Sequence, residues 1–529
     1  MKLIENIGRG LRFDEPDGRF ELLEREPGEP SFFHGRKKSP PPETPDRRAI
    51  CPSLKECRRR LEGAFFREVN TDLILREFRF CGSVNALAAF LNGMADGNGI
   101  SDFILKRAME CPPPGGRQSP VDYALAQVFS LQEAERTDRW AQVEEAIVEG
   151  RTAVLLEGER QAILLDTRGY ACRGVGTAQN ESTVIGPSEA FHENLRISIT
   201  LLRRMVRRAD LVCEFRDVGS QNNVKLALCY LGGVCSEALL QEVKKRLSGV
   251  RPDVLLSAGT LGQRIEDRPW SPVPQTLLTE RPDRAAAALL AGKAVILVEG
   301  SPQALVLPVT LSGLLQTPED SYLRRPAGSI LRFVRLFGAA VSVLMPAYFL
   351  ALAYHHQGLL SSDILSTVIS SRKLVFLPMG AEMIFLLLVF QLVREAGVRV
   401  PGAVGQTVGI IGGLILGQAA VSANFVSTVA LIIVALTGLG NFVIPNYDLQ
   451  IAVACYRVAL CLLAMAGGLL GFSCGIMAAL ILLCDQKSFG VPFLSPYAPK
   501  TVTREPLFFR GGLRSQGWPQ DDMNGEAAL

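Results

Sequence analysis

The sequence predicts a soluble α/β N-terminal region of two subdomains, followed by an α-helical polytopic membrane domain. The chain has 529 residues, 48% of them hydrophobic, and a mean hydropathy of +0.20, so we expect several domains, at least one of them unusually apolar. Three stretches lack Asp, Glu, Lys and Arg: Leu336 to Ser362, Val400 to Tyr447 and Val458 to Cys484. Each is long enough to cross a bilayer, which takes roughly 20 apolar residues.

Residues 1–60 are predicted to form a flexible, charged and proline-rich tail. The stretch from Asp14 to Arg60 is rich in Pro, Arg and Glu, and such a composition buries too little apolar surface to become ordered. The first residues, MKLIENIGRGLRFDEPDG, mix acids and bases and lack the apolar core of a signal peptide. We therefore expect the N-terminal region to stay in the cytoplasm.

Residues 61–180 are predicted to form the first α/β subdomain. Residues 66–78, FREVNTDLILREF, have helix or strand character, and residues 83–94, SVNALAAFLNGM, are expected to form a helix. Residues 151–166, RTAVLLEGERQAILLD, are typical of two strands joined by a Glu-Gly turn.

Residues 181–325 are predicted to form the second α/β subdomain. Residues 190–211 form a basic amphipathic helix pattern and residues 222–233 a strand. Residues 236–249 are expected to form a helix, with Ser236 as its N-cap and Gly249 near its end. Residues 294–311, AVILVEGSPQALVLPVTL, indicate a pair of strands.

Cysteine content, charge and motifs exclude several classes of function. The twelve cysteines are scattered without a CxxC pair, which is typical of reduced packing thiols rather than a disulfide framework or a zinc site. A net charge of +3 is too small to indicate nucleic-acid binding. No P-loop, GxSxG or HExxH motif is present and there are only four histidines, so we expect no enzyme, cofactor or metal site.

Residues 326–485 are predicted to form the membrane domain, with about five or six helices or re-entrant segments, before a C-terminal tail at residues 486–529. Positive residues favour the cytoplasmic side. Those before the first apolar run therefore place the N-terminal region there, and the REAGVR cluster at residues 394–399 is expected to be a solvated cytoplasmic loop. The positive residues before the first run are Arg324, Arg325, Arg332 and Arg335.

Two glycine ladders are predicted to let helices approach closely. Small residues at four-residue steps strip one helix face of side chains, and in lipid such close packing has to supply the attraction between helices. The contact lies either within one chain or between subunits. The first ladder consists of Gly405, Gly409, Gly413 and Gly417, and the second of Gly467, Gly471 and Gly475.

Polar residues within the apolar segments are candidate ion-path residues, because each needs a partner or water at membrane depth. Glu382 is the clearest case. It is either a cation-attracting carboxylate facing a conduit or a neutral or hydrogen-bonded acid that holds a short helix in place. Gln406 and Gln418 are expected to line water, and Arg457 to anchor its helix at the membrane interface by snorkelling.

Several separate motifs, in one order, resemble the A-subunit family of bacterial spore germinant receptors, the GerA type. The motifs are residues 271–311 (SPVPQTLLTERPDRAAAALLAGKAVILVEGSPQALVLPVTL), 335–352 (RLFGAAVSVLMPAYFLAL) and 394–447, which opens REAGVRVPGAVGQTVG. The resemblance extends from Gly186 to Pro499, and the loop motif includes Arg394, Glu395, Arg399 and Pro401.

This resemblance implies a multi-pass protein of the spore inner membrane that couples nutrient sensing to ion release. It further implies a transporter-like B subunit and a lipoprotein C subunit as partners, and a homo-oligomer of the A subunit, in contact with membrane lipid, around an ion-conducting path.

Three alternatives stay open beside this expectation. One is a paralogue of the family that supports dipicolinate release. The second is a secondary transporter, which broken helices and Glu382 would also suit, although the halves of the apolar region show no convincing repeat. The third is a signalling scaffold that conducts nothing.

Overall fold

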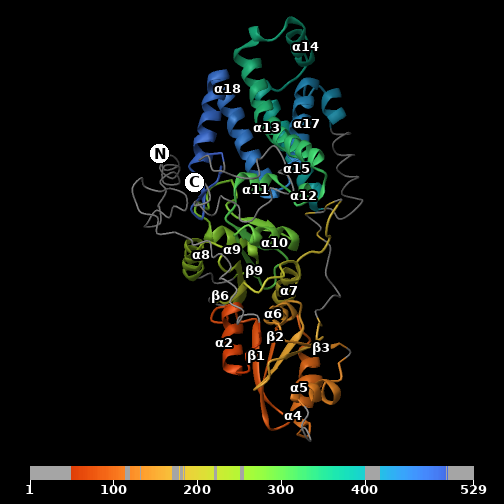
Figure 1. Ribbon diagram of the computed structural model, residues 1–529. Coiled ribbons are helices and arrows are strands. Elements are labelled where there is room, and N and C mark those ends of the chain that lie inside the picture. The colour runs from red at the N-terminus through yellow and green to blue at the C-terminus, as the bar shows by residue number, and fades with distance from the viewer. Residues whose placement is uncertain are drawn as a thin grey trace, which may run out of the picture.

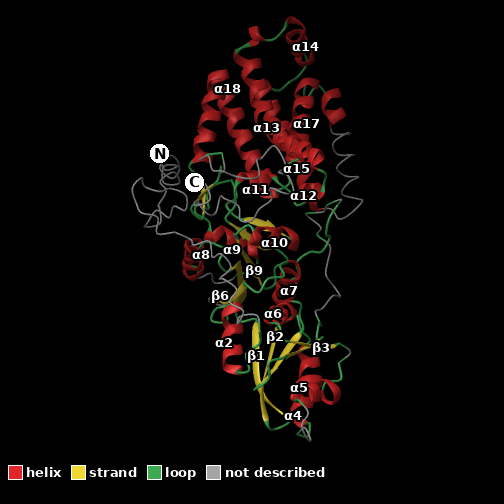
Figure 2. Cartoon of the chain, in the orientation of Figure 1, coloured by secondary structure: helices red, strands yellow, loops and turns green. Residues whose placement is uncertain are grey.

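The computed structural model describes residues 49–113, 119–131, 133–169, 178, 181, 183, 185–219, 223–250, 255–399, 417–495 and 497–498. Figure 1 shows three parts stacked along one long axis, with the first subdomain at one end, the second in the middle and the helical part at the other end. The large sheets lie in the first two parts, whereas the third is built of helices (Figure 2). Sheets in the N-terminal region and a helical C-terminal part agree with the sequence prediction.

The first subdomain is a five-stranded antiparallel sheet in the order β1-β2-β4-β5-β3, with apolar clusters on both faces. Its strands are β1 (Leu73–Phe80), β2 (Val84–Leu91), β3 (Ala134–Thr137), β4 (Thr152–Leu156) and β5 (Ala162–Leu165). Its helical segments are α2 (Leu54–Ala64), α3 (Gly97–Gly99), η2 (Ile100–Lys106), α4 (Arg107–Glu110), α5 (Pro120–Tyr123), η3 (Ala124–Val128) and α6 (Trp140–Val148).

Two local predictions fail in this subdomain. Residues 84–91 form strand β2 instead of a helix, and alternate residues of this strand are buried on opposite faces of the sheet. A strand that is buried on both faces is a continuous apolar run, and hydrophobic periodicity does not distinguish such a run from a buried helix. The predicted tail is also too long, since α2 begins at Leu54 and buries Cys57 and Leu61. The strand pair around the Glu157-Gly158 turn is confirmed as β4 and β5.

The second subdomain is again a five-stranded antiparallel sheet, in the order β6-β7-β9-β10-β8. Its strands are β6 (Leu211–Val218), β7 (Val224–Leu231), β8 (Leu277–Thr279), β9 (Ala294–Val298) and β10 (Ala304–Leu307). Its helices are α7 (Leu195–Met205), α8 (Glu237–Gly249), α9 (Ala258–Ile265), α10 (Pro282–Leu290), α11 (Leu311–Leu315) and α12 (Glu319–Tyr322). The predicted helices at α7 and α8 and the strand pair at β9 and β10 are confirmed, and Ser236 is the N-cap of α8.

The two subdomains repeat one topology. Their strand orders match position by position, and residues 152–165, TAVLLEGERQAILL, correspond to residues 294–307, AVILVEGSPQALVL. Asp72 and Asp210 are equivalent, because each precedes the first strand and its carbonyl accepts a backbone hydrogen bond from the residue after the second strand, at 2.9 and 2.8 Å. Sequence reasoning missed this repeat, although the shared EG turn and the flanking apolar runs signal it.

A buried ion pair joins the two subdomains. Arg203 on α7 donates from Nε and Nη2 to the Asp72 carboxylate at 3.2 and 3.0 Å, and their side chains are 2% and 6% exposed. Burial disfavours the charge of Arg203, but nearby Cys213 and Asp72 raise its pKa above the ordinary value. Asn70 extends the contact, because its side chain donates to the Leu211 carbonyl at 3.5 Å.

The helical part comprises α13 (Arg325–His355), η4 (Gln357–Leu359), α14 (Ser362–Arg372), α15 (Met379–Arg399), α17 (Thr428–Phe442) and α18 (Tyr447–Cys484). By length and composition, two of the described helices, Pro326–His355 and Tyr447–Cys484, could cross a membrane. α18 is a helical hairpin, since Gly468 has a positive φ of 58° and Gly475 packs against Leu460 and Leu463.

The base of the helical part shares a core with the second subdomain. Ile444, Leu449 and Val453 are buried in one cluster with Leu277 and Leu314. The chain then returns to this subdomain through β11 (Lys487–Ser488) and β12 (Val491–Pro492). The predicted C-terminal tail therefore begins too early, because Phe489, Val491 and Phe493 are buried against the second subdomain.

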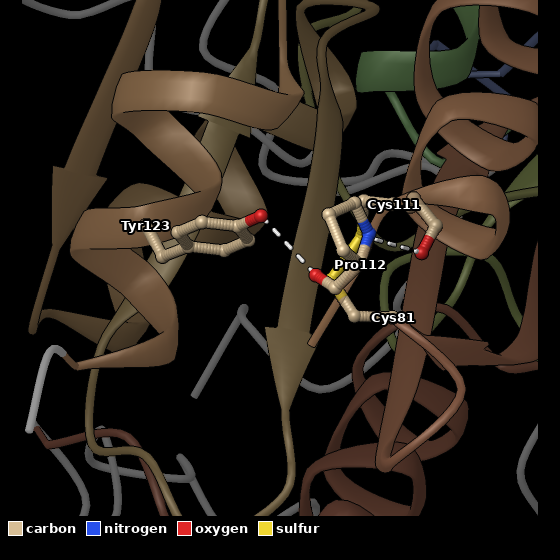
Figure 3. The surroundings of a disulfide bond; sticks show 5 residues. Cys81, Cys111, Pro112 and Tyr123 are labelled. Carbon is tan, nitrogen blue, oxygen red and sulfur yellow. Dashed lines mark hydrogen bonds between the residues drawn. A yellow bond between two sulfur atoms is a disulfide. The ribbon is translucent and has the colours of Figure 1, made fainter. Parts of the chain in front are cut away.

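A disulfide joins Cys81, in the turn after β1, to Cys111 at the end of α4 (Figure 3). The hydroxyl of Tyr123 donates to the carbonyl of Pro112 beside it at 3.1 Å. The prediction that all cysteines are reduced packing thiols is wrong for this pair. The two cysteines are 30 positions apart in the chain, and the fold brings them close enough to bond, which their spacing in the sequence does not reveal. Cys57 does fit the prediction, since burial raises the pKa of its thiol to about 11.

Asp72→Ala removes the carboxylate that compensates a buried guanidinium. We expect it to destabilise the soluble region by about 3–5 kcal/mol, since a buried charge left alone is costly. Denaturant unfolding of the purified chain, followed by tryptophan fluorescence, measures this. Asp210→Ala is the matched control in the second subdomain: its partner Arg208 is at the surface, so the loss should stay below about 1 kcal/mol. Equal losses would contradict the assigned role.

The disulfide predicts a specific chemical result. Alkylation of the unfolded, non-reduced protein should leave two of the twelve thiols unlabelled, and peptide mapping should recover Cys81 and Cys111 in one linked species. Cys81→Ser should lower stability by about 2–4 kcal/mol because the unfolded chain loses a constraint. Cys51→Ser, which removes a free thiol, is the control. Labelling of all twelve thiols would exclude the bond.

Candidate functional site

Glu382 lies fully buried in the first turn of α15, in contact with the end of α14, the helix that Figure 1 shows at the end of the helical part away from the two subdomains. Its carboxylate accepts hydrogen bonds from the backbone N–H and hydroxyl of Ser427, at 2.5 and 2.7 Å. Arg372, the last residue of α14, forms an ion pair with it at 3.1 Å. Ser427 is the N-cap of α17, so Glu382 also lies where a helix terminus favours negative charge.

These contacts connect three helices through one carboxylate. They match the hypothesis of a hydrogen-bonded acid that holds helices in place, and the ion pair with Arg372 adds to these hydrogen bonds. The hypothesis that Glu382 faces an ion conduit stays a prediction.

Arg457 is buried between helices, with 3% of its surface exposed. Its Nη2 donates to the hydroxyl of Ser342 on α13 at 2.8 Å and to the side-chain carbonyl of Asn441 on α17 at 3.0 Å. The expectation of a snorkelling interfacial anchor is therefore wrong. The side chain is held inside because two polar groups from other helices face it, which the sequence of α18 does not reveal.

Arg394 is also buried, and α15 continues unbroken through Arg399. Its guanidinium donates from Nη2 to the side-chain carbonyl of Gln450 and lies 5.1 Å from the centre of the Tyr447 ring. The hydroxyl of Tyr447 in turn donates to Glu395 at 3.5 Å. The predicted solvated loop at residues 394–399 is therefore a helix end packed on α18, while Pro401 lies outside the described residues.

Three glycines of the first ladder, Gly405, Gly409 and Gly413, lie outside the described residues, as does Gln406. That this ladder lets another helix approach closely stays a prediction. Gly417 lies in a helical stretch described at residues 417–422, and the Gln418 side chain in it is exposed.

The second ladder has a role within one chain. A Cβ added at Gly471 would come within 2.1 Å of the Leu463 carbonyl, and one at Gly475 within 2.6 Å of Leu460. Both glycines therefore let the two halves of α18 pack together, whereas Gly467 faces open space. His355 at the end of α13 contacts the carbonyl of Met465, next to this turn, at 2.9 Å.

Sequence reasoning missed a close backbone contact between separate helices. Gly440 on α17 lies against Gly338 on α13, where an added Cβ would be 2.4 Å from the Gly338 carbonyl. Neither residue belongs to a regular ladder, so spacing offers no signal for the pair. The contact brings α17 close to Ser342, which lies one turn after Gly338.

The junction with the second subdomain contains another buried carboxylate, Asp320 on α12, which is fully buried. Arg335 donates to both of its oxygens at 2.8 and 2.7 Å, and Arg332 lies 3.5 Å from it. Two of the arginines used to predict topology are thus partners of an acid. Across the described ranges, no group of three or more His, Cys, Asp or Glu side chains is arranged to hold a metal ion.

The chain matches known proteins over most of its length. The family model described as Bacillus/Clostridium GerA spore germination protein matches residues 60–518. Spore germination protein GerLA of Bacillus cereus is 33% identical over 429 residues, 81% of this chain and 87% of that protein. Uncharacterized membrane protein YfkQ of Bacillus subtilis (strain 168) is 30% identical over 494 residues, 90% of this chain and 96% of that protein.

One solved structure is also similar to part of the chain. It is the N-terminal domain of the A subunit of the Bacillus megaterium spore germinant receptor GerK3. It is 22% identical, covers 49% of this chain and 95% of that chain, and has a TM-score of 0.39.

Glu382→Gln keeps the size of the side chain and one acceptor for Ser427 but removes the charge that Arg372 pairs with. We expect it to lower stability and to show a coupling energy of about 1–3 kcal/mol with Arg372→Gln in a double-mutant cycle. Thermal unfolding of the purified protein in detergent measures both.

Asp363→Asn, which changes an exposed carboxylate on α14, is the control and should have little effect. A role in conduction predicts instead that Glu382→Gln changes cation flux while stability stays at the parental value. A coupling energy of zero between Glu382→Gln and Arg372→Gln would contradict the structural role of Glu382.

Proposed function

Because the chain belongs to the Bacillus/Clostridium GerA family of spore germination proteins, we propose that it is the A subunit of a spore germinant receptor. It would act in the spore inner membrane and couple nutrient sensing to ion release. The proposal includes no catalytic activity and no cofactor. Two helices that are long and apolar enough to cross a bilayer are consistent with a membrane location.

The observation that carries this proposal is the shared base of the helical part and the second subdomain. Leu449 and Val453 of α18 are buried in one core with Leu277 and Leu314, and Asp320 holds Arg335 of α13 by two hydrogen bonds. Close-packed interiors transmit displacement instead of absorbing it. A change in the soluble region would therefore reach the helices directly.

The outer surface of the helical part supports contact with lipid or with other subunits. Large apolar side chains on three helices are more than half exposed in the single chain, and such surface is costly in water. The B subunit, the lipoprotein C subunit and further copies of this chain around an ion path are the proposed protein partners. The exposed side chains include Phe333, Phe337, Ile432, Leu439, Leu470, Met477 and Ile481.

A second candidate is a secondary transporter. Glu382 is a fully buried carboxylate within the helical part, and ionisable residues inside membrane segments mark ion and substrate paths in such proteins. The dipicolinate-linked paralogue and the scaffold are further candidates. Gene deletion tests the first of them and reconstitution the second.

Deletion of the coding region should abolish the germination response of spores to at least one nutrient and leave responses to others intact. The response is measured as loss of optical density and release of ions after addition of single nutrients. Re-expression of the parental chain is the control. Normal responses to every nutrient together with slowed dipicolinate release would favour the paralogue.

Reconstitution separates a conducting subunit from a scaffold. Liposomes that contain the purified chain with its B and C partners should release monovalent cations when the nutrient is added, and liposomes without the chain should not. Nutrient-dependent assembly without any flux would favour the scaffold.

A further inference from the structure

Two buried arginines in the helical part have no carboxylate partner. Arg394 and Arg457 are 8% and 3% exposed, and neither is paired with an acid among the described residues, unlike Arg335 and Arg372. The adjacent Glu395 accepts a hydrogen bond from Tyr447, and its charge acts on Arg394 without a direct ion pair. A buried guanidinium without a counter-charge is strongly unfavourable.

The same arginines leave hydrogen-bond donors unused. Nη1 of Arg394, Nε of Arg457 and Nδ2 of Asn441 are buried and have no hydrogen-bond partner. All three are donors, and none of these atoms can accept. Buried donors in native proteins normally have a hydrogen-bond acceptor. A bound group with several acceptor lone pairs would supply acceptors to these three donors.

These donors belong to one region of the helical part. Arg457 contacts Asn441 directly, and Arg394 contacts Gln450, which lies seven residues before Arg457 on the same face of α18. The two guanidinium charges are close enough to repel each other. Arg394 comes from α15, Asn441 from α17 and Arg457 from α18, so three helices contribute.

Existing dipoles do not neutralise this charge. Asn441 lies in the last turn of α17, and a helix C-terminus supplies roughly half a negative charge. Arg457, which contacts Asn441, carries a full positive charge. The acid closest in sequence on α18, Asp448, is nine residues before Arg457 and therefore on the opposite side of that helix.

We infer that Arg394, Asn441 and Arg457 form a buried binding site for an oxyanion, a phosphate or carboxylate group. Guanidinium groups bind such oxygens by parallel N–H donors, and the Asn441 amide adds a neutral donor. The site lies toward the end of the helical part that joins the second subdomain, since Ile444 and Leu449 nearby belong to the shared core. A lipid headgroup and a free anion both carry the required chemistry.

The test uses the purified full-length chain in phosphatidylcholine nanodiscs. Inorganic phosphate is titrated at constant ionic strength, with chloride as the control anion, and the melting temperature is recorded. A ligand that binds the folded protein raises the melting temperature, and above the dissociation constant this rise grows with the logarithm of the ligand concentration. A second arm replaces part of the phosphatidylcholine with phosphatidylglycerol and measures retained lipid by native mass spectrometry.

A saturable shift with phosphate in both lipids identifies a free anion as ligand. Stabilisation and lipid retention with phosphatidylglycerol, and no further effect of phosphate, identify a headgroup. Arg457→Gln and Arg394→Gln should each weaken the effect by about tenfold or more. Lys373→Gln, an exposed cation near the far end of the helical part, should leave it unchanged.

The variants also separate binding from a purely structural role. Arg394→Gln also removes the contacts to Gln450 and Tyr447, so the decisive quantity is the rise in melting temperature that phosphate causes, and not the melting temperature without it. Arg394→Gln replaces Arg457→Gln if that variant fails to accumulate. The inference is overturned if neither phosphate nor phosphatidylglycerol stabilises the parental chain. It is also overturned if the arginine variants respond as Lys373→Gln does.

Discussion

Every charge that this fold buries has to be compensated, because a guanidinium or carboxylate removed from water is costly without a partner. One arginine–carboxylate pair meets this requirement at each level of the stack. Asp72 and Arg203 join the two subdomains, Asp320 and Arg335 join the second subdomain to the helices, and Glu382 and Arg372 join helices at the far end. Each pair connects two segments that are separated in the sequence.

The repeated subdomains show how one topology serves two purposes. The equivalent residues Asp72 and Asp210 make the same backbone contact, yet only Asp72 is buried against the neighbouring subdomain, while Asp210 pairs with Arg208 at the surface. The second copy instead uses its other end to hold the helical part, through Leu277 and Leu314. Position in the stack, and not local sequence, therefore decides which residues become interface.

Glycines in the helical part allow close contacts between helices, and the spacing of these glycines in the sequence predicts only some of the contacts. The four-residue step of Gly471 and Gly475 correctly indicates a close approach, but the partner is the preceding half of the same helix, because Gly468 reverses the chain. Gly338 and Gly440 make a close contact between separate helices without any regular spacing. A periodic pattern identifies a bare helix face, whereas the identity of the opposing surface depends on the turn between helices.

Sequence reasoning located the candidate polar residues but not their environments. Glu382, Arg394 and Arg457 all stood out as charges beside or within apolar segments, since a charge is conspicuous there. The interfacial anchor and the solvated loop proved wrong, because Ser342, Asn441 and Gln450 come from other helices and receive the two arginines. The disulfide between Cys81 and Cys111 escaped for the same reason, since it depends on α4 returning to β1.

The sequence by itself determined the order of the charged N-terminal and apolar C-terminal regions, five of the helices and strands of the second subdomain (α7, α8, β7, β9 and β10), and the family resemblance. These follow from local composition and periodicity, which a reader of the chain can measure directly. Only the tertiary structure decided that β2 is a strand, that α18 is a hairpin and that three helices bring Arg394, Asn441 and Arg457 together. Contacts between residues far apart in the chain depend on how whole elements pack, and no local pattern encodes that arrangement.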